Sequence, residues 1–138
     1  MRYLFDTNTC VAILADGWGV LTNLRVAPEE VGLSAITAWE LEGGCVLSAR
    51  AQENRHRLDA LLAEVNPLPF AVAEARRAGE LHATLERAGL RLSTADCLIA
   101  GHALALSLTL VTHDRDFSRV PGLHRVDWLP AGYSRGRK

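Results

Sequence analysis

Short apolar runs alternate along this chain with longer segments in which apolar residues recur every three or four positions. The runs at 3–5, 31–35 and 109–112 predict buried β-strands, and weaker runs at 68–70 and 124–128 predict two more. Helices are predicted over 8–14, 20–26, from 37 onward, and over 58–65, 75–88 and 95–106. This alternation predicts an α/β fold, a three-layer α/β/α sandwich whose mostly parallel sheet is covered by helices on both faces.

The predicted helix over 95–106 carries apolar residues on all sides. A helix of this kind is enclosed by its neighbours and does not have one face open to water. Gly101 lies in its middle, and a residue without a side chain permits another helix to approach closely. We therefore expect this helix to lie in the interior of the molecule.

Composition limits the class of protein. With 138 residues, of which 49% are hydrophobic, the chain suits one compact domain over 1–133, followed by a loose basic tail at 134–138. The formal net charge is only −1, so a polyanion has to be recognised by local groups. There is no signal-peptide pattern and no apolar stretch long enough to span a membrane, which predicts a cytoplasmic protein without membrane contact.

Acidic residues follow the predicted strands at the points where the strands end. Asp6 comes directly after the first strand, and Asp114 and Asp116 come after the strand at 109–112. Glu40 lies in the first turn of the helix after the second strand, and Asp96 begins the apolar helix. Ligands of parallel α/β sheets bind beyond the carboxyl ends of the strands. We therefore expect these five acids to gather at one edge of the sheet.

Each acid also has a structural explanation as a helix cap. Residues 37–40 and 93–96 both have the spacing of a capping box, and Asp6 or Asp114 suits the cap of the turn that follows it. Carboxylates brought together from separate segments, however, repel one another unless a cation lies between them. Their convergence therefore favours a metal site over a set of unrelated caps.

The ligand types indicate which metal and which chemistry. A site built from carboxylates, without cysteine or paired histidines, suits Mg²⁺, with Mn²⁺ as the alternative. Such an ion activates a bound water and neutralises charge on a leaving oxygen, which predicts hydrolysis of a phosphodiester. His113 adjoins Asp114 and is the one histidine that we consider for a phosphate contact.

Several segments in order along the chain carry a family resemblance. They are residues 3–8 (YLFDTN), 34–37 with 40–44, 96–100, and 110–117 (LVTHDRDF) followed by 119–123 and 127–128. Together they resemble the PIN-domain ribonucleases and, among these, the VapC-type toxins of bacterial toxin–antitoxin pairs. The resemblance spans nearly the whole chain and implies a PIN-like fold.

The resemblance assigns catalysis and metal binding to Asp6, Glu40, Asp96 and Asp114. Asp116 is a fifth candidate ligand, and whether it or Asp114 supplies the fourth ligand is open. Asn8 and Thr112 are assigned supporting roles. Glu42 competes with Glu40 by proximity, but Glu40 holds the position that the family pattern gives to its acid.

The resemblance also implies partners. It makes the chain a magnesium-dependent endoribonuclease that acts on RNA as the toxin of a toxin–antitoxin pair. A homodimer is implied, together with a cognate antitoxin whose segment lies over the active site. Contacts to RNA phosphates are expected from Arg115, Arg119 and His113.

Two other classes of function compete with this one. A phosphatase of haloacid-dehalogenase type, one of the metal-dependent phosphohydrolases, also places an aspartate after its first strand. It needs a second aspartate two residues later, where this chain has Asn8, and a lysine after a later strand, whereas the only lysine is Lys138. A catalytically silent PIN module that binds RNA or protein is the other alternative, and the intact set of acids argues against it.

Overall fold

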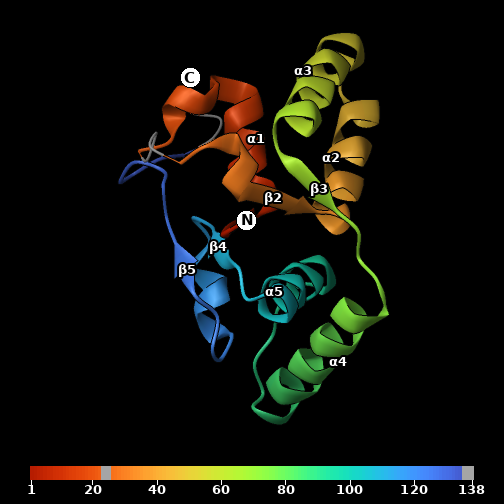
Figure 1. Cartoon of the computed structure of the whole chain (residues 1–138), viewed down its shortest axis with the longest axis vertical. Helices are drawn as coiled ribbons and strands as arrows, with labels where there is room; N and C mark the ends of the chain where they lie inside the picture. The colour runs from red at the N-terminus through yellow and green to blue at the C-terminus, as the bar shows by residue number, and fades with distance from the viewer. Residues whose placement is uncertain (23–25, 135–138) are drawn as a thin grey trace.

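A parallel sheet of five strands runs through the centre of the computed structural model, which describes residues 1–22 and 26–134 (Figure 1). The strands are β1 (Tyr3–Phe5), β2 (Val31–Ser34), β3 (Asn66–Leu68), β4 (Thr109–Val111) and β5 (Arg125–Val126), in the spatial order β3-β2-β1-β4-β5. Every neighbouring pair is parallel. All the carboxyl ends therefore lie along one edge of the sheet, with β1 in the middle.

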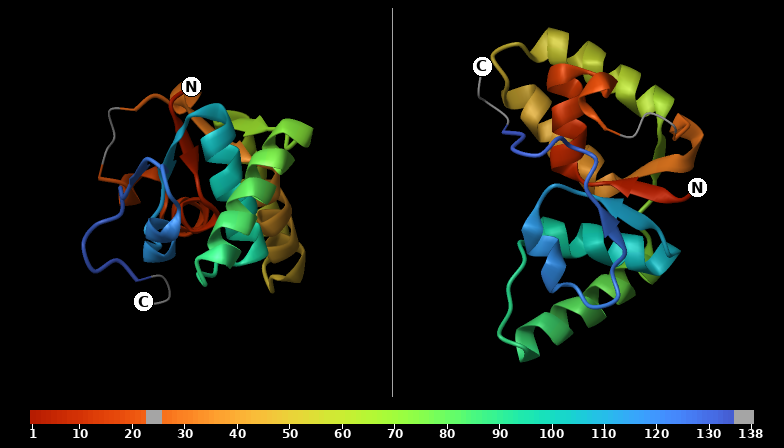
Figure 2. Two further views of the ribbon diagram at one scale, coloured as in Figure 1. Left: turned by 90° about the horizontal axis from the view of Figure 1, so that it is seen from below. Right: turned by 90° about the vertical axis from the view of Figure 1, so that its left-hand side faces the viewer.

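Helices cover both faces of this sheet, as the sequence predicts. On one face lie α1 (Thr7–Asp16), α2 (Ala35–Leu47) and α3 (Ala51–Glu64), and on the other lie α4 (Val72–Arg87) and α5 (Thr94–Leu106) (Figures 1 and 2). Three short 3₁₀ helices lie in the connections: η1 (Trp18–Val20), η2 (Pro28–Glu30) and η3 (Arg115–Arg119). The predicted three-layer α/β/α fold with a parallel sheet is confirmed.

Two apolar cores fill the spaces between the layers. Side chains of a strand alternate between its two faces, and in β1 Leu4 packs with α4 and α5 while Phe5 packs with α1, α2 and α3. In β4 Leu110 and Val111 divide between the same two cores. The central strands are therefore buried on both sides, which fixes the positions of the residues that follow them.

The packing of α5 against α4 depends on Gly101. A Cβ atom at this position would lie 2.5 Å from the Cα of Ala78 in α4. The two helices are thus as close as a residue without a side chain allows, and most of the middle of α5 is fully buried. Both expectations for this helix, its enclosure and the close approach at Gly101, are confirmed.

Two predicted elements differ from the structure. The helix predicted over 20–26 is not formed in its described residues, because Thr22 uses its backbone N–H and its hydroxyl to bond the carbonyl of Trp128, at 2.6 and 2.9 Å. The strand predicted over 68–70 is shifted to Asn66–Leu68, since these residues pair with β2. Pro67 is tolerated there because β3 is an edge strand.

Some expectations lie outside the described residues. Positions 23–25 of the predicted helix and positions 135–138 of the predicted tail belong to this group. In the described part of the chain, no helix is both long and apolar enough to cross a membrane.

Candidate active site

Asp6 lies at the carboxyl end of the central strand β1 and is almost completely buried. Its Oδ1 atom accepts a 2.8 Å hydrogen bond from the backbone N–H of Thr9, so Asp6 is indeed the N-cap of α1. Its Oδ2 atom accepts a 2.6 Å hydrogen bond from the hydroxyl of Thr112, at the end of β4. The cap thus accounts for one oxygen, while the other is fixed by a residue 106 positions away.

Burial changes the acidity of Asp6. It raises the pKa of this carboxyl to about 6, although the hydrogen bonds from Thr112 and Thr9 act in the opposite direction. The negative charge of Asp96 also contributes to the rise in pKa. The ionised form of Asp6 is therefore poorly stabilised by the protein alone.

Glu40 reaches the same edge from the second turn of α2. The expected position in the first turn is wrong, because α2 begins already at Ala35, with Ser34 as its N-cap. The Thr7 hydroxyl, one residue after Asp6, donates a 2.5 Å hydrogen bond to its Oε1 atom. Glu42, the competing acid, instead forms two hydrogen bonds of 2.7 Å with the guanidinium of Arg55 in α3, and this contact lowers the pKa of Glu42. The geometry thus favours Glu40 over Glu42 as a member of the site.

Asp96 and Asp114 complete the group of acids from the other side. Asp96 lies in the first turn of α5, where its backbone N–H donates to the Ser93 hydroxyl at 3.1 Å. Burial raises the pKa of Asp96, and the charges of Asp114, Glu40 and Asp116 raise it further. Asp114 accepts a 2.9 Å hydrogen bond from the backbone N–H of Asp116 and so caps η3.

The negative charge of these acids is not balanced by basic side chains. Within residues 1–22 and 26–134, neither Asp6, Glu40, Asp96 nor Asp114 forms an ion pair with an arginine or a lysine. Asp116 differs, because the guanidinium of Arg119 lies 3.2 Å from its Oδ1 atom. The structure thus distinguishes four uncompensated acids from a fifth that is already paired.

The candidate RNA contacts occupy different surroundings. Arg119 donates to the carbonyl of Arg91 at 2.9 Å in addition to its pair with Asp116, whereas Arg115 is exposed at the start of η3. Nδ1 of His113 lies 2.7 Å from the carboxylate of Asp127, the residue after β5. Their contacts with RNA stay predictions.

Comparison with known proteins places this arrangement in a family. The model of the PIN domain matches residues 3–123. The chain belongs to the PIN-domain family. It is similar to ribonuclease VapC2 of Rickettsia felis (34% identity, covering 93% of this chain and 98% of the relative) and to the tRNA(fMet)-specific endonuclease VapC of Shigella flexneri (28%, 93% and 98%). Among solved structures, the DNA-bound VapBC from Salmonella typhimurium matches with a TM-score of 0.83 at 27% identity, covering 93% of this chain and 98% of that chain.

The donor set of this PIN domain fits a hard divalent cation. All four uncompensated acids offer carboxylate oxygens, and no basic side chain of the described residues pairs with the buried Asp6 to stabilise its ionised form. Among the described residues, no three acidic, histidine or cysteine side chains come close enough to hold an ion directly. Mg²⁺ suits such spacing, because it retains several waters and takes only one or two carboxylates directly.

Some residues at the site were not selected from the sequence. Asp127 follows β5 in the structure, but it lies inside the strand predicted over 124–128, so the rule that selected Asp6 and Asp114 could not select it. Thr7 and Thr9 had no sequence signal either; the Thr9 hydroxyl donates to the carbonyl of Val111 at 3.1 Å. Tyr133 approaches His113 from the end of the described chain, with ring centroids 6.1 Å apart.

Proposed function

We propose that this chain is a magnesium-dependent endoribonuclease, the toxin of a toxin–antitoxin pair, acting in the cytoplasm. The observation that carries the proposal is the buried Asp6 together with Glu40, Asp96 and Asp114 at the carboxyl edge of a PIN-domain sheet, where none of the four pairs with a basic side chain of the described residues. Relatives of nearly the same length are named ribonucleases, which supports RNA as the substrate.

The four acids hold the cation in this proposal, with Asp116 as a further candidate ligand and Mn²⁺ as an alternative ion. Bound Mg²⁺ supplies an activated water and neutralises charge that develops on the leaving oxygen. Thr112 and Thr9 hold the Asp6 carboxylate in one orientation, and Thr7 does the same for Glu40. Because both carboxylates are fixed beforehand, little reorganisation is needed when the phosphodiester binds.

The acidic edge also determines how RNA approaches. A phosphate is repelled by four uncompensated carboxylates, so binding of RNA and of the cation is expected to be mutually dependent. Arg115 at the start of η3 and Asn8 at the start of α1 supply nearby positions for contacts with the RNA. His113 and Arg119 are further candidates, each already oriented by an aspartate.

The partner of the toxin in this proposal is a cognate antitoxin protein, and the toxin itself forms a homodimer. VapBC complexes of related proteins from Salmonella typhimurium and Haemophilus influenzae support the pairing. Apolar side chains left exposed on α2 are consistent with a protein contact there: Trp39, Val46 and Leu47.

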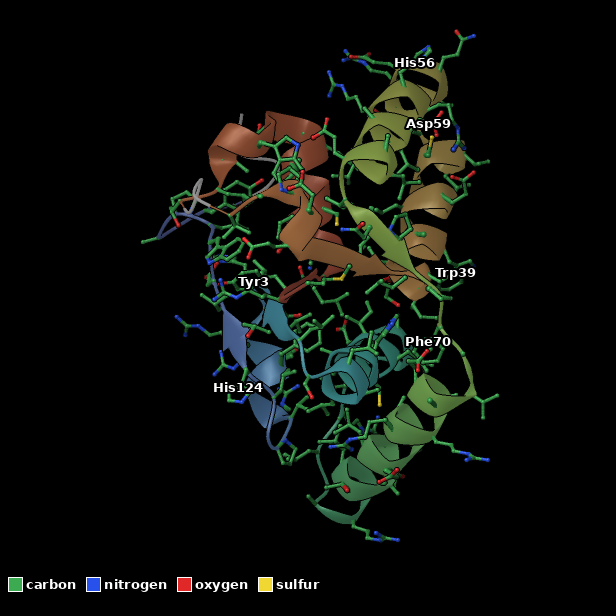
Figure 3. The ribbon with its side chains drawn as sticks, in the orientation of Figure 1. Tyr3, Trp39, His56, Asp59, Phe70 and His124 are labelled. Atoms are coloured by element: carbon green, nitrogen blue, oxygen red, sulfur yellow. The ribbon has the colours of Figure 1, made fainter. Side chains whose placement is uncertain are left out.

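Substitution of the acids tests the proposal. We expect Asp6→Asn and Asp96→Asn each to abolish magnesium-dependent RNA cleavage and growth arrest on expression, while the protein still folds. Asp59→Asn is the matched control, because Asp59 is an exposed aspartate of α3 remote from the site (Figure 3). Undiminished cleavage by both site variants would refute the assigned acids.

Metal titration separates an enzyme from a silent binding module. Calorimetry should detect Mg²⁺ binding to the wild-type protein and much weaker binding to Asp6→Asn. Cleavage should cease with EDTA and return with Mg²⁺ or Mn²⁺. A protein that binds RNA but shows neither metal binding nor metal-dependent cleavage would be the silent module.

A further inference from the structure

A cavity of about 330 Å³ lies directly beside the acidic site. It is lined by Asn8, His113, Asp114, Leu129 and Tyr133. Asp114 belongs both to this cavity and to the group of four acids, so the two sites share a wall. If the charged group of a ligand lies at the acids, the group next to it in the same ligand can therefore enter the cavity.

One carboxylate fixes two of the cavity walls. Oδ2 of Asp127 lies 2.7 Å from Nδ1 of His113, and Oδ1 accepts a 3.0 Å hydrogen bond from the backbone N–H of Leu129. Both oxygens of Asp127 are thus occupied in orienting an imidazole ring and an apolar side chain. At this part of the lining the cavity therefore presents the imidazole ring of His113 and the buried side chain of Leu129, while the carboxylate of Asp127 is not free.

Tyr133 forms another part of the lining. Its ring is nearly perpendicular to that of His113, at an angle of 89°, and its hydroxyl donates to Oδ2 of Asp16 at 3.1 Å. The backbone N–H of Tyr133 also donates to the carbonyl of Pro130 at 3.0 Å. The ring is therefore anchored at both ends, and an anchored ring loses little entropy when a flat ligand stacks on it.

We propose that this cavity binds one unpaired nucleobase of the RNA, next to the phosphate that lies at the acids. The inference rests on the proposed function and adds to it a subsite for a base. Proteins that recognise single-stranded RNA stack unpaired bases on aromatic side chains, including tyrosine and histidine, and bind the base edges through hydrogen bonds. The rings of His113 and Tyr133 supply the stacking surface.

Asn8 supplies the hydrogen-bonding groups for the base edge. Its side-chain amide has both donors and an acceptor, it is exposed at the start of α1, and in the described part of the chain no hydrogen bond engages it. A cationic peptide side chain is a less suitable occupant, because the Asp127 carboxylate is already used by His113 and Leu129 and the other carboxylate, that of Asp114 in the lining, is assigned to the cation in the proposed function. The observations thus favour a base over a protein side chain.

The test measures binding separately from cleavage. Full-length wild-type protein, whose four acids are intact, is titrated with fluorescent single-stranded RNA oligonucleotides in which one nucleotide at a time is abasic. Ca²⁺ replaces Mg²⁺ in the buffer, and a gel run after each titration checks that the RNA is still intact. We expect one position at which removal of the base weakens binding by about 5- to 150-fold, the range for a stacked base. Tyr133→Leu in the same buffer should weaken binding of intact RNA by a similar factor and remove the sensitivity at that position.

Two further variants make the result specific. Tyr133→Phe keeps the ring and removes the hydroxyl that donates to Asp16, so binding by this variant should again depend on the base at that position. His124→Leu removes an exposed ring at the amino end of β5, away from the acids (Figure 3), and should behave like the parent protein. If Tyr133→Leu binds intact and abasic RNA as the parent does, or if no oligonucleotide binds measurably, the inference is overturned.

The remaining outcomes distinguish the two proposals. Normal metal-dependent cleavage by the wild-type protein, with no position sensitive to the base, would overturn the base subsite and leave the nuclease intact. Sensitivity to one base without metal-dependent cleavage would support the subsite and overturn the enzyme. If Tyr133→Leu weakens binding of the cognate antitoxin and leaves RNA binding unchanged, the cavity belongs to a protein contact and the base subsite is wrong.

Discussion

Thr112 joins Asp6 to Asp114 through a single hydroxyl. This hydroxyl donates to Oδ2 of Asp6 at 2.6 Å and accepts from the backbone N–H of Asp114 at 3.0 Å. It lies at the end of β4, which pairs directly with β1. Two of the proposed ligands from distant parts of the chain are thus held in register by one side chain between them.

Loss of this hydroxyl should weaken metal binding. Thr112→Val keeps the shape of the side chain but leaves Oδ2 of Asp6 and the N–H of Asp114 without their partner. Since the hydrogen bond from Thr112 lowers the pKa of Asp6, its removal also favours the protonated form of this acid. Residues that orient metal ligands in this way are typically worth about 10- to 100-fold in metal affinity or activity. We expect a loss of that size in calorimetric titration with Mg²⁺.

Thr112→Ser is the matched control for this prediction. It retains the hydroxyl and removes only a methyl group, so its Mg²⁺ affinity should remain near that of the wild type. Equal affinities for Thr112→Val and the wild type would contradict the role given to the hydroxyl.

Asp6 should reduce the stability of the metal-free protein. Because burial raises its pKa from 3.8 to about 6, the folded state binds the proton more tightly than the unfolded state does. The free energy of unfolding therefore falls as the pH rises from about 4 to 6, in total by roughly 3 kcal/mol, and the loss is complete above pH 6. Asp6→Asn removes this loss and keeps a good helix cap.

Urea denaturation in EDTA checks this prediction. At pH 7 Asp6→Asn should be more stable than the wild type, and the difference should shrink as the pH falls below 6. Added Mg²⁺ should raise the midpoint of the wild type and leave that of the variant nearly unchanged, because ligands stabilise only the state that binds them. A variant less stable than the wild type at pH 7 would show that the ionised carboxyl is not penalised by burial.

The position of the acids follows from the sequence because it depends on few contacts. Asp6 and Asp114 lie close after the ends of β1 and β4 and Asp96 lies in the first turn of α5, while parallel pairing brings the strand ends to one edge. Glu40 lies deeper in α2, in its second turn, and still reaches this edge. The segment around Thr22 could not be predicted in this way. Its pattern suits a helix, but its hydrogen bonds go to Trp128, 106 residues away. The local helix propensity of this segment is overridden by these hydrogen bonds to a distant residue.

The cavity beside the acids could not be predicted from the sequence either. Tyr133 takes part through a hydrogen bond to Asp16 over a separation of 117 residues and through a ring contact with His113. No local pattern near Tyr133 indicates either contact. The strand β3 was displaced by two residues for a related reason, since its register is set by pairing with β2.

The two neighbouring glutamates of α2 should differ sharply in function. Glu40 accepts the hydroxyl of Thr7 at the acidic edge, while Glu42 is held by Arg55 on the surface. Glu40→Gln should reduce magnesium-dependent RNA cleavage by at least about 10-fold, the lower range for altering a metal-site residue. Glu42→Gln should cleave as the wild type does. A larger loss for Glu42→Gln than for Glu40→Gln would reverse the assignment.

The contact between α4 and α5 should be sensitive to a single methyl group. In Gly101→Ala the new Cβ would lie 2.5 Å from both Cα and Cβ of Ala78 and 2.8 Å from its backbone nitrogen. These atoms are the backbone and Cβ of a residue in α4, so they can move only if the helix moves. The overpacking should therefore lower the free energy of unfolding by about 1–3 kcal/mol. Urea denaturation measures this cost.

Gly79→Ala provides the control on the facing helix. No atom lies within 4 Å of a Cβ at Gly79, which is exposed in α4. Because alanine restricts the unfolded chain more than glycine does, Gly79→Ala should stabilise the protein by about 0.5–1 kcal/mol. The two substitutions make the same chemical change in two helices and should have opposite signs. If Gly101→Ala were as stable as Gly79→Ala, α4 and α5 would have to be farther apart than the structure places them.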